Sequence, residues 1–286
     1  MLPEKRGDGF RQRSYSSQNG AEYPKYFVES AIIRNFAVEN RETRRRLSNS
    51  SELDCVRLAR ALLRQIKKNE DIILDETMKR EINPQESNRT EAFSMWMSSP
   101  VPMVTLVKTF DVSRMVKASK RTGIKFNILM CWCIGRAAKD IKEFYLLPEH
   151  GKLFQYDRLA INVIVENCKN GISSCDIPYS DDLQQFNSDY LRLTAQAASE
   201  CKSTFLEDHM IIGTSTLVQT EIDCIVNQYS GKFNNPFLAW ARYRKGWFKT
   251  TLPISFQFHH VQMDGGHAAK FLQRLQDEIR TVKRVL

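Results

Sequence analysis

From residue 101 onward, strand-like and helix-like hydrophobic patterns alternate along the chain, and this alternation constrains the fold more than any other feature. The stretch VPMVTLVKTFDV (101–112) is rich in β-branched residues, which predicts a strand. An amphipathic run that stops near Gly123 and a long apolar run (125–144) predict two helices. The remaining predicted elements are a strand pair (152–166), a helix (180–206), strands (209–226), a strand (250–260) and a C-terminal helix (265–286). The sequence therefore predicts an α/β fold in which helices cover a sheet.

The first 84 residues have a different character. Residues 1–20 are polar and rich in Ser, Gly, Gln and Arg, which predicts a disordered tail. Residues 21–84 are predicted to be a helical N-terminal extension, in which a serine cap and acidic first-turn residues begin a helix at 51–69. The Asn-Pro pair in NPQESNR (83–89) indicates a linker, so the main domain is expected to span 85–286.

Composition limits the classes of function. The chain of 286 residues carries a net charge of +9, but its one dense basic run, RETRRR (41–46), lacks interleaved aromatics and is interpreted as solvated rather than as a nucleic-acid site. No apolar run approaches the roughly 20 residues of a membrane span, and the N-terminus does not resemble a secretory signal. The seven cysteines are scattered without a CxxC pair, which favours reduced, mostly buried thiols in a cytoplasmic protein.

The segment PISFQFHHVQMDGGH (253–267) concentrates polar and titratable residues where a strand pattern changes to a helix pattern. In a regular strand His260 would share a face with Phe256 and Phe258, whereas His259 would point to the opposite face. Because the two histidines diverge, a metal site is not favoured. His260 is either a core histidine with satisfied nitrogens or a general base at a strand end, where α/β folds commonly place reacting groups.

These residues resemble the HHxxxDG motif of chloramphenicol acetyltransferase and the wider family of CoA-dependent acyltransferases. The flanking Pro253 and Gln257 are similar to that family's motif strand, and NRTEAF (88–93) resembles its Arg-x-Glu-x-Phe entry segment. The resemblance covers roughly residues 85–284 and is nearest to chloramphenicol-acetyltransferase-like O-acetyltransferases. It implies a two-layer sandwich with a large mixed β-sheet covered by helices, acetyl-CoA as co-substrate without a metal, a small hydroxylated acceptor, and a homotrimer with active sites between subunits.

The same resemblance implies a role for each motif residue. His260 would remove the proton from the acceptor hydroxyl and return it to the departing CoA thiolate, in a direct transfer without a covalent enzyme intermediate. Asp264 would pair with Arg89 and fix the loop that holds the histidine. Gly265 would permit a sharp turn where a side chain would obstruct. His267, in the first turn of the following helix, is interpreted as a cap or pocket wall.

One part of the family pattern is missing. The family places an oxyanion-stabilising serine after a Pro-Trp pair, but the corresponding stretch here is GTSTLVQTEIDCIV (213–226). The position falls on Thr220 or Glu221, with Ser215 as a nearby hydroxyl, and Thr220 is the predicted substitute. A glutamate there would repel an oxyanion. The alternative function is a non-catalytic relative that keeps the trimeric scaffold and binds CoA or a partner. The sequence does not indicate the CoA-contacting residues.

Overall fold

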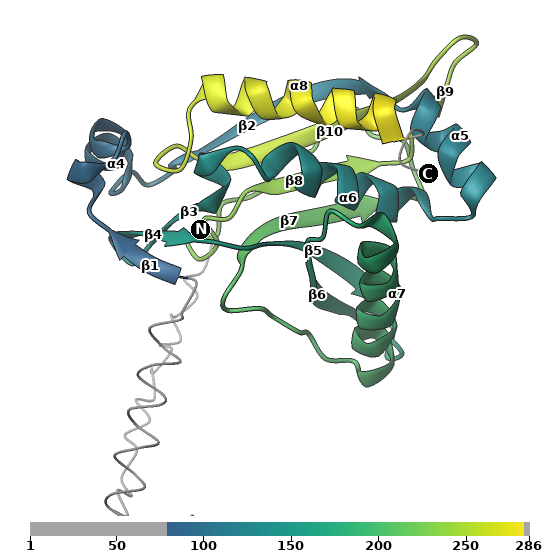
Figure 1. Cartoon of the computed structure of the whole chain (residues 1–286), viewed down its shortest axis with the longest axis horizontal. Coiled ribbons are helices and arrows are strands. Elements are labelled where there is room, and N and C mark those ends of the chain that lie inside the picture. Colours follow the sequence, from purple (N-terminus) through teal and green to yellow (C-terminus); the bar gives the residue numbers. More distant parts are fainter. Residues whose placement is uncertain (1–78, 283–286) are drawn as a thin grey trace, which may run out of the picture. The chain divides into compact units, whose positions relative to one another are not determined.

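A computed structural model describes residues 79–282, and its centre is a seven-stranded sheet (Figure 1). The strands follow the order β2-β10-β8-β7-β5-β6, and β9 pairs with β10. Their bounds are β2 Met103–Asp111, β5 Leu159–Glu166, β6 Ile172–Pro178, β7 Met210–Leu217, β8 Phe237–Ala241, β9 Arg244–Lys245 and β10 Thr250–His259. Strand β7 is parallel to both β5 and β8, whereas the other pairs are antiparallel. The sheet is therefore mixed, as predicted.

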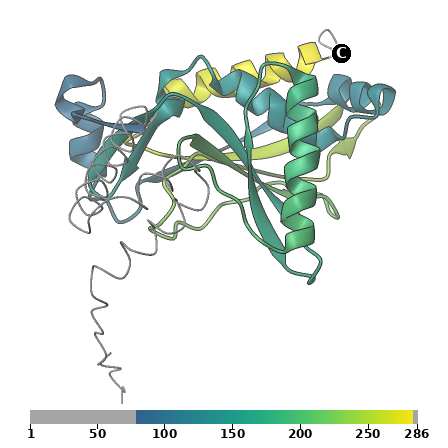
Figure 2. The ribbon, with the colours of Figure 1, turned by 60° about the horizontal axis from the view of Figure 1, so that its bottom comes forward.

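Helices form a single layer over one face of this sheet. They are α5 Ser113–Thr122, α6 Phe126–Ala138, α7 Leu183–Glu200 and α8 Gly265–Thr281 (Figures 1 and 2). The inner helix α6 is apolar on nearly all sides, and ten of its thirteen residues are buried. Phe256 of β10 lies with its ring centroid 4.8 Å from that of Phe271 in α8. The predicted two-layer α/β architecture is confirmed.

The other face of β10 carries polar side chains, as the alternation predicted. Ser255 Oγ accepts a hydrogen bond from the backbone of Ile225 (3.0 Å), and Gln257 Nε2 donates to the carbonyl of Asn227 (3.1 Å). Both partners belong to the segment that links β7 to β8 across the helix-free face. Residues 209–226 are thus strand only as far as Leu217, and the prediction of strand beyond that point is wrong.

A second, three-stranded sheet joins β1 Lys79–Ile82, β4 Lys152–Tyr156 and β3 Leu146–Glu149. It packs with the short helix α4 Thr90–Trp96 in a separate hydrophobic cluster. The prediction that the helical extension reaches residue 84 is wrong, because residues 79–82 pair with β4 and belong to the domain. That pairing joins residues more than seventy positions apart, so no local pattern reveals it. The tail predicted over 1–20 and the helices predicted over 21–78 lie outside the described residues.

Five strands, β1, β3, β6, β8 and β9, were not predicted. One disulfide corrects the interpretation of the cysteines. Cys168, in the turn after β5, is bonded to Cys201 at the end of α7. The turn and the helix end are already adjacent, since Cys168 N donates to the carbonyl of Ala198 (3.0 Å). Cys131, Cys133 and Cys175 are buried thiols, as expected, and Cys224 is exposed. None of the helices between residues 79 and 282 is long and apolar enough to cross a membrane.

Candidate active site

Strand β10 ends at His259, and a short buried turn leads into helix α8. His260 is the first residue of this turn, and its backbone N–H donates to the carbonyl of Pro102 (2.8 Å). The carbonyl of His259 accepts hydrogen bonds from Gln262 N (2.9 Å) and Met263 N (3.3 Å). His260 therefore lies beyond the regular strand, and the strict alternation predicted for it ends one residue earlier.

Arg89 holds this turn in place through four hydrogen bonds. Its guanidinium donates to both carboxylate oxygens of Asp264 (2.6 and 2.9 Å), to the carbonyl of Val261 (2.8 Å) and to the carbonyl of His260 (2.8 Å). The Arg89 side chain is only 2% exposed, whereas that of Asp264 is 45% exposed. The planar guanidinium matches the carboxylate in a bidentate pair and uses its remaining donors on the backbone. The predicted pairing of Arg89 with Asp264 is present in the structure.

The ring of His260 is fixed on one side and open on another. It stacks on the indole of Trp96 at the end of α4, with centroids 4.9 Å apart and planes inclined by 7°. Its Nδ1 is buried without a hydrogen-bond partner and lies 3.5 Å from Asp264 Oδ1. The side chain is nevertheless 30% exposed. Nε2 has no hydrogen-bond partner between residues 79 and 282 and is not among the buried atoms, so this nitrogen can receive a proton from a ligand.

Asp264 supplies a negative charge to the turn that contains His260. Its hydrogen bonds to Arg89 lower the pKa of this carboxyl, against the opposing effect of partial burial. Asp264 is also the N-cap residue of α8, where a negative charge is favoured by the helix dipole. The carboxylate therefore stays ionised beside His260 at neutral pH.

His259 is a structural residue. It is 1% exposed, and its Nδ1 accepts a hydrogen bond from Val261 N (3.1 Å). Burial, with a smaller contribution from the neighbouring His260, lowers the pKa of His259 to about 4. The imidazole is consequently neutral at physiological pH.

Of two further predicted roles, the capping role of His267 is seen in the structure and the turn role of Gly265 is not. His267 accepts a hydrogen bond on Nδ1 from Asp264 N (3.2 Å), and its Nε2 lies 3.2 Å from Glu143 Oε1, so it caps α8 as predicted. Gly265 does not have its predicted role within this chain. A Cβ at this position would meet open space, and the turn is made by residues 260–264 before the helix begins.

Thr220 and Glu221 lie at the opposite end of the sheet from His260. Thr220 is exposed, and its carbonyl accepts a hydrogen bond from Arg242 N (2.8 Å), just beyond the end of β8. Gln257, near the histidine end of β10, pairs instead with Phe237 at the start of β8. At ~3.3 Å per strand residue, Thr220 and His260 are separated by roughly 25 Å. Ser215 lies within β7, and one chain does not bring these hydroxyls to His260.

A cationic cavity of about 790 Å³ adjoins the Thr220 end of the sheet. Lys125, Arg242 and Lys245 line it, together with Glu221 and the first residues of α6. No sequence pattern indicates this cavity, because its cations come from segments more than one hundred residues apart.

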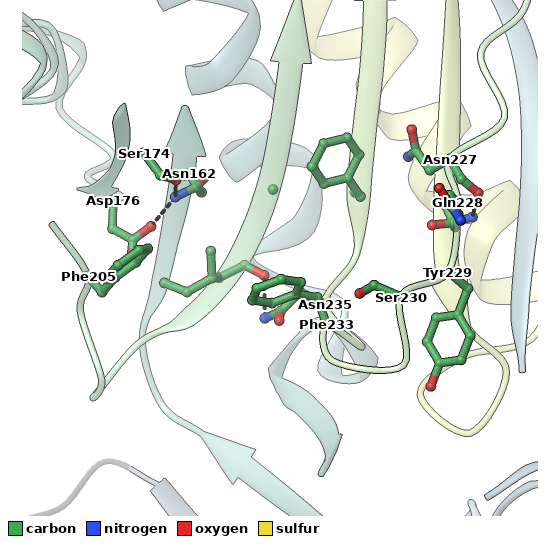
Figure 3. A pocket seen from close by; sticks show the side chains of 14 residues that line it. Asn162, Ser174, Asp176, Phe205, Asn227, Gln228, Tyr229, Ser230, Phe233 and Asn235 are labelled. Atoms are coloured by element: carbon green, nitrogen blue, oxygen red, sulfur yellow. Dashed lines mark hydrogen bonds between the residues drawn. The ribbon is translucent and has the colours of Figure 1, made fainter. Parts of the chain in front are cut away.

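A second cavity, of about 530 Å³, lies on the helix-free face nearer the histidine end (Figure 3). Phe205, Phe233 and Phe237 supply apolar walls. Asp176 lines it as well, and its Oδ1 accepts a hydrogen bond from Asn162 Nδ2 (2.6 Å). Burial raises the pKa of this carboxyl. No sequence pattern indicated this cavity either, since neither β6 nor β8 was predicted.

Comparison with known proteins identifies the family. The sequence model described as chloramphenicol acetyltransferase matches residues 79–276, which is more than half of the chain. The chain belongs to the chloramphenicol acetyltransferase family. Chloramphenicol acetyltransferase 2 of Escherichia coli is 26% identical over 196 residues, covering 66% of this chain and 91% of the relative. Chloramphenicol acetyltransferase 3 of Escherichia coli is 26% identical over 179 residues, covering 60% and 84%.

Solved structures support the same fold. A chloramphenicol acetyltransferase superposes with a TM-score of 0.62 at 19% identity, covering 70% of this chain and 99% of the other. A probable dihydrolipoamide acetyltransferase from Listeria monocytogenes gives a TM-score of 0.53 at 12% identity, covering 72% and 95%. Membership of the chloramphenicol acetyltransferase family makes this protein an acyltransferase, as the motif predicted.

The Arg89 contacts generate a stability prediction. Arg89→Ala removes four hydrogen bonds and leaves two backbone carbonyls of the turn unpaired, so it should lower the free energy of unfolding by about 2–4 kcal/mol. The matched control is Arg274→Ala, whose ion pair with Asp140 is more exposed and should cost less than about 1 kcal/mol. Urea unfolding measures both, and an equal loss in the two variants would contradict the role of Arg89.

The buried His259 generates a pH prediction. Its folded-state pKa of about 4 lies below the ordinary value of 6.5, so the unfolded chain binds more protons between these values. Stability from this group is therefore complete above about pH 6.5 and falls, by about 3 kcal/mol in all, as the pH drops toward 4. His259→Gln should flatten this part of the profile of unfolding free energy against pH. An unchanged slope would show that His259 is not the titrating group.

Proposed function

We propose that this protein transfers the acetyl group of acetyl-CoA to a hydroxyl of a small molecule, with His260 as the general base. The observation that carries the proposal is the state of the His260 imidazole: its ring is held by Trp96, its turn is held by Arg89, and its Nε2 is free for a ligand. A base restrained in one orientation loses little entropy when the substrate binds. Family membership supports the acetyl-transfer chemistry.

The transfer proceeds in one ternary complex. Nε2 of His260 takes the proton of the acceptor hydroxyl while the hydroxyl oxygen bonds to the thioester carbonyl carbon. The carbon–sulfur bond then breaks, and the imidazolium returns its proton to the CoA thiolate. The products are an acetyl ester and free CoA, and no covalent enzyme intermediate forms. The ionised Asp264, 3.5 Å from Nδ1, favours the imidazolium that forms transiently.

The cationic cavity suits the phosphates of CoA. Lys125, Arg242 and Lys245 surround it, and the first residues of α6 line the same space, where the positive end of the helix dipole favours an anion. Tyr243 and Phe126, whose ring centroids lie 5.3 Å apart, supply an aromatic wall. These contacts support the assignment of this cavity, rather than the cavity on the helix-free face, to CoA.

The cavity on the helix-free face suits the acceptor. Its walls are mainly aromatic, while Asn162, Ser174 and Asp176 supply a few polar groups at one side (Figure 3). The unpartnered Nδ2 of Asn227 is a further donor beside it. An apolar molecule with several hydroxyls would match this lining.

The separation of His260 from Thr220 supports an active site shared between copies of the chain. The CoA cavity and Thr220 lie at one end of the sheet, and His260 lies at the other, so one chain alone does not assemble the set. The helix-free face also exposes the large apolar side chains of Phe205, Val226 and Phe233, which a neighbouring subunit would cover. We infer a homotrimer in which His260 of one subunit completes the site of the next, with Thr220 as the candidate oxyanion donor.

A thiol-release assay tests the base directly. His260→Ala should lower acetyl-CoA turnover by about 10²–10⁴-fold without unfolding the protein, because it removes the proton acceptor and leaves the Arg89 hydrogen bonds to the turn in place. The control is His209→Ala, which removes a histidine that is paired with Asp208 and lies outside the turn of residues 260–264. Acceptors should include chloramphenicol and a panel of polyols and amines. If His260→Ala retained turnover, the assignment of His260 as the base would be wrong. If the protein bound CoA but acetylated none of the acceptors, the non-catalytic alternative would be favoured.

Complementation tests the shared site. His260→Ala and Arg242→Ala should each be inactive as pure oligomers. Mixed oligomers should regain activity, since the intact histidine of one subunit meets the intact cavity of the other. The measurement is thiol release after co-expression and purification through two different tags. If the mixture stays inactive while the oligomers exchange subunits, the site is contained in one chain.

A further inference from the structure

The hairpin that joins β8 to β10 ends in two aromatic side chains that the described chain leaves uncovered. Trp247 is 100% exposed and Phe248 is 97% exposed. The hairpin containing β9 extends beyond the body of the domain, at the end of β10 opposite the turn that leads into α8 (Figure 1). Exposure of two adjacent large aromatics is costly in water, because each carries about 150–250 Å² of surface. The fold of one chain therefore does not account for the exposure of these two side chains.

The tip is a defined structure. Arg244 and Lys245 of β9 pair with Thr251 and Thr250, and Gly246 N donates to the carbonyl of Lys249 (2.8 Å) to close the loop. A Cβ on residue 246 would lie 2.9 Å from that carbonyl oxygen, so a glycine is required for the closure. The closed loop directs both aromatic side chains away from the domain.

Positive charge surrounds the aromatic tip. Residues 242–249 have the sequence RYRKGWFK, with four cations and no acidic residue. Helix α5 begins at the base of the hairpin, where Thr250 N donates to Ser113 Oγ (2.8 Å). This helix adds four exposed cations: Arg114, Lys117, Lys120 and Arg121. The acidic groups that face the hairpin are Asp223 and Glu221, both near Arg244, and Asp111, near Lys249, so the cations are in clear excess.

We propose that this basic aromatic tip, residues 242–249, binds the surface of an anionic lipid bilayer. Tryptophan is favoured at the level of the lipid headgroups, and flanking Lys and Arg are attracted to anionic lipids. The convex shape of the tip favours a bilayer over single-stranded nucleic acid, which requires a groove that follows the backbone. Like charges on two tips would repel each other, which disfavours a contact between tips of two copies.

The base of this tip adjoins the candidate CoA cavity, because Arg242, Tyr243 and Lys245 also line that cavity, whereas the aromatic end of the tip does not. Trp247 and Phe248 line neither of the two cavities, so their substitution leaves the CoA and acceptor contacts in place. The proposal therefore stands whether or not the acetyl transfer proposed above is confirmed.

Sedimentation with lipid vesicles tests the proposal on the full chain. The protein should bind phosphatidylglycerol–phosphatidylcholine vesicles and bind pure phosphatidylcholine vesicles much more weakly. The double substitution Trp247→Ser and Phe248→Ser should weaken partitioning by about tenfold or more, because it removes the inserted apolar surface. Lys249→Gln should weaken binding several-fold to anionic vesicles only. The matched control Ile172→Ser, at a site 74% exposed on β6, should bind like the wild type.

Fluorescence gives a second readout. Trp132 and Trp240 are buried and Trp96 is stacked on His260, so a blue shift on vesicle addition reports Trp247. Trp247→Phe should keep vesicle binding and lose that shift. The proposal would be overturned if the double substitution left vesicle binding unaffected, or if the protein showed no preference for anionic lipid. A change of oligomeric state in the double variant would overturn it as well, because the tip would then be a subunit contact. Tighter binding to a single-stranded oligonucleotide, lost in the same variant, would also overturn it.

Discussion

The geometry of the candidate site depends on one buried guanidinium. Arg89 lies 171 or more positions before its partners, and it joins the entry segment to the turn between β10 and α8 through His260, Val261 and Asp264. Removing a cation from water is costly, so its position is stable only while the carboxylate and carbonyls stay in place. The same contacts set the direction in which the His260 ring points, and Trp96, from the helix that follows Arg89, fixes its plane. Arg89 therefore affects both the stability of this turn and the position of the candidate base.

The sheet places different chemical groups at its two ends. The turn with His260 lies at one end of β10, and the cationic cavity and Thr220 lie at the other end of the neighbouring strands. Helices cover one face, whereas the opposite face carries a cavity and exposed aromatic side chains. An enzyme that joins two substrates benefits from binding each in its own region, provided that the reacting atoms meet. Under the shared-site proposal, the reacting atoms meet between two copies of the chain.

Much of the site was predictable because it is local in sequence. The change from strand to helix around His260 and the cap formed by His267 follow from residues within one turn and its flanks. The Arg89 pairing was predictable only through the family resemblance, since nothing near Arg89 in the chain indicates a buried position. The cations of the cavity at the Thr220 end of the sheet, the stacking of Trp96 and the strand β1 were not predictable. Each depends on which distant segments become neighbours.

The sequence alone determined the class of fold and the HHxxxDG motif, because hydrophobic periodicity and short motifs are properties of contiguous residues. The tertiary structure decided the rest. Strand order placed Thr220 far from His260, gathered Lys125 and Arg242 at one cavity, and paired Cys168 with Cys201. The physical reason is that burial and pairing depend on contacts between segments separated by tens to hundreds of residues, and those contacts exist only once the sheet has formed.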